Sequence, residues 1–224
     1  MKGAPPQRLL DGYRRFRQER FLVEAQRFRE LAHGQAPRTM VVGCADSRVD
    51  PSTIFSAAPG ELFVVRNVAN LVPPCEENGT YHGTSAALEF AVTQLRITDI
   101  VVLGHGMCGG IAAALAAAEN RPAGRFIQPW IDLLSLVRDE VRKDPSLSSP
   151  AARQRALEHL AIQHSLKNLQ SFPFISDAMK NGQLAPHGAW FSIAEGELHW
   201  LNHSSKLFEP VEPDPEGPGA VSFG

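Results

Sequence analysis

The sequence contains few cysteines, almost no net charge and no long hydrophobic run. Its 224 residues include three cysteines, a number that does not suit a disulfide framework and leaves metal-binding or catalytic roles open to the thiols. The formal net charge of -2 gives no electrostatic argument for binding nucleic acid or an anionic membrane. The longest apolar run, around residues 111–118, is far shorter than the ~20 residues of a membrane span. We therefore predict no nucleic-acid or membrane partner.

The first residues also lack the continuous apolar core of a secretory signal. Residues 1–13 read MKGAPPQRLLDGY and have no sustained apolar stretch. On this basis we predict a cytoplasmic protein, in a reducing compartment that keeps thiols free.

Three short runs of apolar, often β-branched residues indicate buried strands, at 39–42, 62–65 and 99–103. Their uninterrupted apolar character is typical of strands covered on both faces, as in a parallel sheet. Helix-like segments occupy 84–95, 111–119, 126–142 and 151–172, and a hairpin-like pair lies at 190–194 and 198–201. We predict one α/β domain over 1–224, in which helices flank a mostly parallel sheet. A helical arm over 1–33 and a flexible, Pro/Gly-rich tail over 209–224 complete it.

Cysteine and histidine residues occur where two of these strands end. Cys44 follows the run at 39–42, and His105 and Cys108 follow the run at 99–103. Because the carboxyl ends of parallel strands meet at one crevice, we expect the three side chains in a single site. Two thiolates and one imidazole suit Zn(II), and three ligands leave a fourth position for water or substrate. The sequence therefore predicts a zinc centre.

The turn around His105 also matches the G-x-G-x-x-G pattern of dinucleotide-binding loops. Its glycines are Gly104, Gly106 and Gly109, between an apolar strand and an alanine-rich helix. A dinucleotide site needs a further strand that ends in an acidic residue ~20 positions on. Residues 121–129 (RPAGRFIQP) supply neither. We assign the glycines to a tight turn around a metal, with amides at a helix N-terminus available to an anion.

Two charged residues follow Cys44 in the metal loop. Asp46 and Arg48 could form a structural ion pair, which is the usual role of such neighbours. An Asp46 held by Arg48 would stay ionised, accept hydrogen bonds only and orient a zinc-bound hydroxide. Asp46 could equally move onto the zinc as a fourth ligand and switch the site off. Both alternatives stay open at this point.

Three motifs together resemble those of the β-class carbonic anhydrases. They are CADSR at 44–48, ELFVVRNVAN at 61–70 and HGMCGG at 105–110. The resemblance is close over about 34–110, looser to about 201, and has plant-like motifs at a bacterial-type length. It implies a central parallel sheet of four strands with an added edge strand, and zinc at the strand ends. It also implies a homodimer, or a tetramer or larger assembly, with the N-terminal helices around the partner subunit.

The resemblance assigns roles to individual residues. Cys44, His105 and Cys108 match the zinc ligands, and Asp46 matches the additional ligand of the closed state. Asp46 and Arg48 match the catalytic dyad. One Zn(II) per subunit is implied, and the implied activity is the reversible hydration of carbon dioxide to bicarbonate and a proton by a zinc-bound hydroxide. The alternatives are hydrolysis of carbon disulfide or carbonyl sulfide on the same zinc site, and a non-catalytic zinc-binding protein closed by Asp46.

The resemblance also implies substrate-binding residues, and at some positions this chain departs from the family. Gln35 matches a glutamine that hydrogen-bonds substrate, and Phe63 matches an apolar pocket residue. Gly109 would offer its backbone N–H to a substrate oxygen. Phe90 stands where plant-like members carry a pocket tyrosine, which removes a hydroxyl from the expected pocket.

Other family features are absent from the sequence. Where members with an inhibitory bicarbonate site carry tryptophan and tyrosine, this chain has Val41 and Phe191. We therefore expect no such site, and we expect Arg66 to act in a structural ion pair. Cys75 has no counterpart among the zinc ligands and is interpreted as an incidental thiol.

Overall fold

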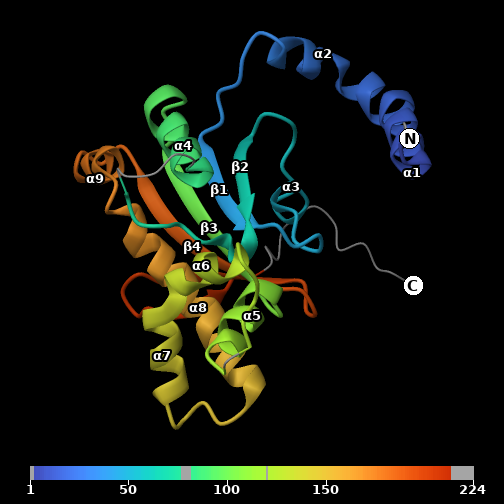
Figure 1. The fold of residues 1–224 in the computed structure, drawn as a ribbon. Coiled ribbons are helices and arrows are strands. Elements are labelled where there is room, and N and C mark those ends of the chain that lie inside the picture. The colour runs from blue at the N-terminus through green and yellow to red at the C-terminus, as the bar shows by residue number, and fades with distance from the viewer. Residues whose placement is uncertain (1–2, 77–81, 120, 213–224) are drawn as a thin grey trace.

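A computed structural model describes residues 3–76, 82–119 and 121–212, which surround one central sheet (Figure 1). The strands are β1 (Thr39–Cys44), β2 (Leu62–Asn67), β3 (Asp99–His105), β4 (Ala185–Ser192), β5 (Glu197–Leu201) and β6 (Phe208–Pro210). Their order in the sheet is β2-β1-β3-β4-β5-β6. The first four run parallel, and β5 and β6 are antiparallel additions. The predicted mostly parallel α/β sheet is confirmed.

The added part of the sheet has two strands rather than the single edge strand expected. β6 pairs with β5, so that Glu209 lies opposite Trp200. The predicted flexible tail therefore begins too early at 209, and its residues 213–224 lie outside the described part of the chain. One aromatic contact accounts for this ordering, because the Phe208 ring packs 4.3 Å from the His159 ring. Pro210 lies on the edge of the sheet, where the missing N–H costs no ladder hydrogen bond.

Nine α-helices lie in the described residues, besides two π-helical and two 3₁₀ segments. They are α1 (Gln7–Arg15), α2 (Phe21–Leu31), α3 (Pro51–Ile54), α4 (Gly83–Glu89), α5 (Gly109–Ala117), α6 (Ile127–Ile131), α7 (Ser135–Lys143), α8 (Pro150–Leu169) and α9 (Pro173–Lys180). The helix expected over 151–172 is α8, which ends three residues earlier, at Leu169. α9 was not predicted; it starts at Pro173, after an extended backbone at Phe172. The helix expected over 126–142 is interrupted by a 3₁₀ turn between α6 and α7.

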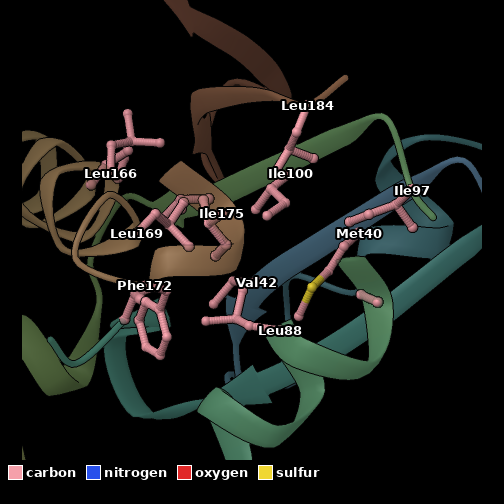
Figure 2. Packing of buried hydrophobic residues seen from close by; sticks show 14 of the residues in the cluster. Met40, Val42, Leu88, Ile97, Ile100, Leu166, Leu169, Phe172, Ile175 and Leu184 are labelled. Atoms are coloured by element: carbon pink, nitrogen blue, oxygen red, sulfur yellow. The ribbon is translucent and has the colours of Figure 1, made fainter. Parts of the chain in front are cut away.

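β1 and β3 are buried on both faces, as their uninterrupted apolar sequences predicted. β2, at the edge of the sheet, has no buried residue, and its Val64 is exposed, so the prediction of a buried strand was wrong there. Met40 and Val42 of β1 lie in a cluster with residues of α4, α8 and α9 (Figure 2). Val41, between them, lies in a separate cluster on the other face with Val101 of β3. This double burial fixes β1 and β3, and therefore the ends at which Cys44 and His105 stand.

The N-terminal arm is helical, as predicted, and extends away from the sheet (Figure 1). α1 and α2 are joined by a π-helical segment, Phe16–Arg20, and none of these three segments has a buried residue. Arg27 connects the arm to the domain through the Pro59 carbonyl and the Glu61 carboxylate, each at 2.9 Å. Within the described residues, no helix has the length and apolar character needed to cross a membrane.

Candidate metal centre

The structure brings the three predicted zinc ligands together at the carboxyl end of the parallel sheet. β1 and β3 are neighbours with Gly43 opposite Leu103, so both strands deliver their last residues to one place. Cys44 ends β1, His105 ends β3, and Cys108 is the N-cap of α5. Their ligand atoms lie within 4.8 Å of one another, and all three residues are buried.

The donor set fits a zinc ion. The two sulfur atoms of Cys44 and Cys108 are 3.9 Å apart, close to the ~3.8 Å that follows from tetrahedral angles and Zn–S bonds of ~2.3 Å. His105 Nδ1 lies 2.9 Å from the Gly106 carbonyl oxygen, which can only accept, so Nδ1 carries the ring proton. His105 Nε2 is buried without a hydrogen-bond partner among the described residues. A lone pair without a partner beside two thiols is what a metal ligand requires.

The thiols of Cys44 and Cys108 differ in how readily they lose a proton. A hydrogen bond from the Cys108 thiol lowers the pKa of Cys44 to about 4, although burial acts in the opposite direction. The same hydrogen bond and burial raise the pKa of Cys108. Burial opposes protonation of His105, but the neighbouring Cys44 thiolate raises the pKa of the imidazole overall. The site therefore holds one thiolate readily and needs a cation to hold two.

Asp46 lies beside the Cys-His-Cys group and is paired with Arg48. The Arg48 Nε and Nη2 donate to the two Asp46 oxygens at 2.9 and 2.7 Å, and the Arg48 backbone N–H donates at 3.0 Å. These hydrogen bonds hold the pKa of the Asp46 carboxyl well below its usual range. Arg48 Nη2 also donates to the Met107 carbonyl at 3.2 Å. Arg48 therefore links the loops that follow β1 and β3.

Arg66 supports the loop after Cys44 from β2. It forms the predicted ion pair, with Asp50 at 3.2 Å. Its other hydrogen bonds go to backbone carbonyls, to Cys44 at 2.8 Å and to Asp46 at 2.6 Å. The guanidinium thus fixes the backbone on both sides of the metal loop rather than entering the site.

Glu158, a residue that the sequence analysis did not identify, also contacts the metal loop. It lies on the buried face of α8 with Leu157 and Ala161, and its carboxylate accepts the Cys108 backbone N–H at 3.1 Å. Burial raises its pKa against the effect of its N–H donors. The sequence does contain a signal that could have identified Glu158, because it is a charged residue at a position where the helical repeat predicts an apolar one.

The predicted substrate-binding residues are divided between the two ends of the sheet. Gly109 begins α5 directly after Cys108, at the metal group. Gln35 precedes the amino end of β1 and lines a surface depression with residues of α2, so one chain does not bring it to the metal group. Phe63, near the start of β2, stacks on Phe90 with ring centroids 5.9 Å apart. Cys75 lies outside the Cys-His-Cys group.

Two adjacent glycines at the start of α5 have opposite steric environments, which gives a stability prediction. A Cβ at Gly110 would lie 2.8 Å from Val68 Cγ1 and 2.9 Å from Ala69 Cβ, whereas a Cβ at Gly109 has no neighbour within 4 Å. We expect Gly110→Ala to lower the free energy of unfolding by about 1–3 kcal/mol. The control Gly109→Ala should leave it unchanged or raise it by up to ~1 kcal/mol. Urea denaturation of both variants without metal measures this, and equal stabilities would contradict the packing described.

Comparison with known proteins places this chain among carbonic anhydrases. The model of the carbonic anhydrase family matches residues 39–198. Beta carbonic anhydrase 6, mitochondrial, of Arabidopsis thaliana is 36% identical over 194 residues, which cover 86% of this chain and 66% of the relative. Beta carbonic anhydrase 5, chloroplastic, of the same plant is 34% identical over 180 residues, which cover 80% and 59%.

Solved structures agree with this result. The β-carbonic anhydrase CcaA has a TM-score of 0.84 and 32% identity, over 92% of this chain and 98% of its own. One of two tetrameric β-carbonic anhydrases from Sordaria macrospora has a TM-score of 0.77 and 31% identity, over 88% and 96%. The likeness therefore extends over nearly the whole of these solved chains.

The comparison corrects the predicted cytoplasmic location, because the two plant relatives are mitochondrial and chloroplastic enzymes. The prediction rested on the lack of an apolar signal core, which is a criterion for secretion only; organellar transit peptides are amphipathic and arginine-rich. This chain also spans only 66% and 59% of the length of these relatives. The family model and the likeness to solved β-carbonic anhydrases nevertheless extend across most of this chain, which belongs to the β-class of the carbonic anhydrase family.

Proposed function

We propose that this protein catalyses the reversible hydration of carbon dioxide to bicarbonate and a proton. The observation that carries the proposal is the buried Cys44–His105–Cys108 group with a carboxylate, Asp46, held beside it by Arg48. The names of the plant relatives support it, since both are beta carbonic anhydrases.

Cys44, His105 and Cys108 would hold the zinc ion, one per subunit. Zinc bound there would supply Lewis acidity, which lowers the pKa of water from 15.7 to about 7 in favourable sites. Asp46, ionised and acceptor-only, receives a hydrogen bond from the reacting water and directs an oxygen lone pair at carbon dioxide. Arg48 holds both Asp46 oxygens by a bidentate hydrogen bond, so the carboxylate would not be free to serve as a further zinc ligand. This arrangement argues against a structural zinc site closed by Asp46.

Gly109 has a separate role in the proposal. Its backbone N–H belongs to the first turn of α5, where amides have no partner within the helix. An N–H at a helix N-terminus stabilises an anion, so Gly109 donates to an oxygen of the developing bicarbonate.

The active form is proposed to be a homodimer or a larger assembly. Leu9, Tyr13, Leu22 and Val23 of the arm are each at least 60% exposed, which leaves an apolar surface for a second subunit. One comparison structure is described as a tetrameric enzyme. In such an assembly, Gln35, Phe63 and Phe90 could lie beside the metal group of the partner subunit instead of that of their own chain.

Stopped-flow measurement of carbon dioxide hydration, with a pH indicator and zinc-loaded protein, tests the proposed activity. We expect hydration well above the buffer rate between pH 7 and 9. Hydration no faster than buffer over this range, with zinc content confirmed at one per subunit, would reject the proposal.

A further inference from the structure

Glu158 is a buried charged group that the proposed chemistry does not use. It is 4% exposed, at a place where an ionised carboxylate is stable only if hydrogen bonds replace its water. Arg155, on the same helix, does not serve as its counter-ion but places its guanidinium over the Trp190 ring, 4.7 Å from the centroid. The environment of Glu158 therefore depends on its hydrogen bonds.

The partners of Glu158 in the described residues are three N–H donors. Its Oε1 accepts from the Cys108 backbone N–H and from Gln154 Nε2, both at 3.1 Å. Its Oε2 accepts from Trp190 Nε1 at 3.2 Å. These donors require a side chain in which both terminal atoms accept hydrogen bonds. A carboxylate has two accepting oxygens, whereas an amide has one oxygen and one donating NH₂ group.

The Cys108 N–H belongs to a peptide unit that is held at both ends by charged side chains. The other end of this unit is the Met107 carbonyl, which accepts from Arg48 Nη2 at 3.2 Å. One peptide plane thus lies between the Arg48 cation and the Glu158 anion. The same Arg48 holds Asp46, so the peptide connects α8 to the proposed dyad.

This peptide also determines where the Cys108 sulfur lies. Met107 has a positive φ of 57°, which is uncommon for a residue with a side chain and persists only where the surroundings hold it. Loss of either hydrogen bond would free this peptide, and with it the backbone from which the Cys108 side chain projects. The position of the Cys108 sulfur therefore depends on the Met107–Cys108 backbone, and Arg48 and Glu158 hold that backbone in place.

From this arrangement we infer that Glu158 is a positioning residue for the metal centre. It fixes the Met107–Cys108 peptide against Arg48, and so sets the direction in which Cys108 presents its sulfur to zinc. The inference rests on the metal site of the proposed function and not on carbon dioxide as the substrate.

The Glu158→Gln variant tests this inference. An amide can still accept the Cys108 N–H, but its NH₂ group then meets the Trp190 N–H, donor against donor. We expect zinc affinity, measured by competition with a chromophoric chelator, to fall 10–100-fold, the usual effect of losing an outer partner of a metal ligand. With Co(II) in place of zinc, the thiolate-to-metal absorption band should weaken, because one sulfur is misplaced. The double variant Glu158→Gln/Trp190→Phe removes the opposing donor and should recover most of the affinity.

Ser165→Ala is the matched control, because Ser165 is a buried residue of α8 whose Oγ accepts a backbone N–H, from Val72 at 3.1 Å. It should lower thermal stability yet leave zinc affinity and the cobalt spectrum within about twofold of the parent. Folded Glu158→Gln with zinc affinity within twofold of the parent, or a double variant without recovery, would overturn the inference. If Glu158→Gln does not fold, Glu158→Asp replaces it, and unchanged affinity there has the same meaning. A parent that binds zinc but does not hydrate carbon dioxide rejects the proposed function alone.

Discussion

Replacement of Asp46 by asparagine is expected to lower carbon dioxide hydration by roughly 100-fold or more while zinc stays bound. The variant keeps an oxygen that can accept from Arg48, but it brings an NH₂ group to the position where the carboxylate accepts from the reacting water. Zinc content should not change, because Asp46 is not in the Cys-His-Cys group. Stopped-flow hydration and metal analysis of the same preparation measure both effects.

Asp144→Asn provides the control for this substitution. Asp144 is exposed, and its side chain accepts from the backbone and hydroxyl of Ser146 in a surface turn. This variant should hydrate carbon dioxide at the parent rate within a factor of two. Undiminished turnover in Asp46→Asn would remove Asp46 from the mechanism and leave the Arg48 pair as a purely structural contact.

The Asp46–Arg48 ion pair also constrains the pH dependence of the proposed activity. Arg48 holds the pKa of Asp46 well below its usual value of 3.8, so Asp46 is ionised between about pH 5 and 9. Any change of activity in that range must then come from another group. Since the pKa is lowered in the folded state, the contribution of the pair to stability is present above about pH 4 and is lost as the pH falls further.

The sequence was sufficient to predict the parts of the fold that hold the proposed metal ligands. β1 and β3 are buried on both faces, and such strands have continuous apolar sequences that are recognisable without a structure. The site followed from this placement, because Cys44 and His105 end two strands that are neighbours in the sheet.

The elements that the sequence did not predict depend on contacts between distant residues. β6 is held by pairing with β5 and by Phe208 against His159, which no local pattern indicates. The proposed role of Glu158 also depends on a distant contact, because its carboxylate accepts the backbone N–H of Cys108, fifty positions earlier in the chain. The sequence also did not predict that Gln35 lies away from the metal group of its own chain. A motif match identifies a residue but does not say at which end of the sheet it lies.

Replacement of Cys44 by serine is expected to abolish zinc binding and the hydration activity with it. A serine hydroxyl is a much poorer zinc ligand than a thiolate, and Cys44 is the thiol whose pKa is lowered, to about 4, by its neighbour Cys108. Zinc at 100 times its dissociation constant stabilises a folded protein by about 2.7 kcal/mol. For a chain of this size, that corresponds to a rise in Tm of roughly 5–11 °C. The parent should show this rise on addition of zinc, and Cys44→Ser should show none.

Cys75→Ser is the matched control, because it makes the same exchange at a free thiol outside the metal group. It should bind one zinc per subunit, show the full rise in Tm and retain activity. Calorimetry with and without zinc, together with metal analysis, distinguishes the two variants. Zinc binding by Cys44→Ser at parental affinity would mean that the metal is held elsewhere. Loss of binding in both variants would make Cys75 a ligand, which is incompatible with a centre formed by Cys44, His105 and Cys108 alone.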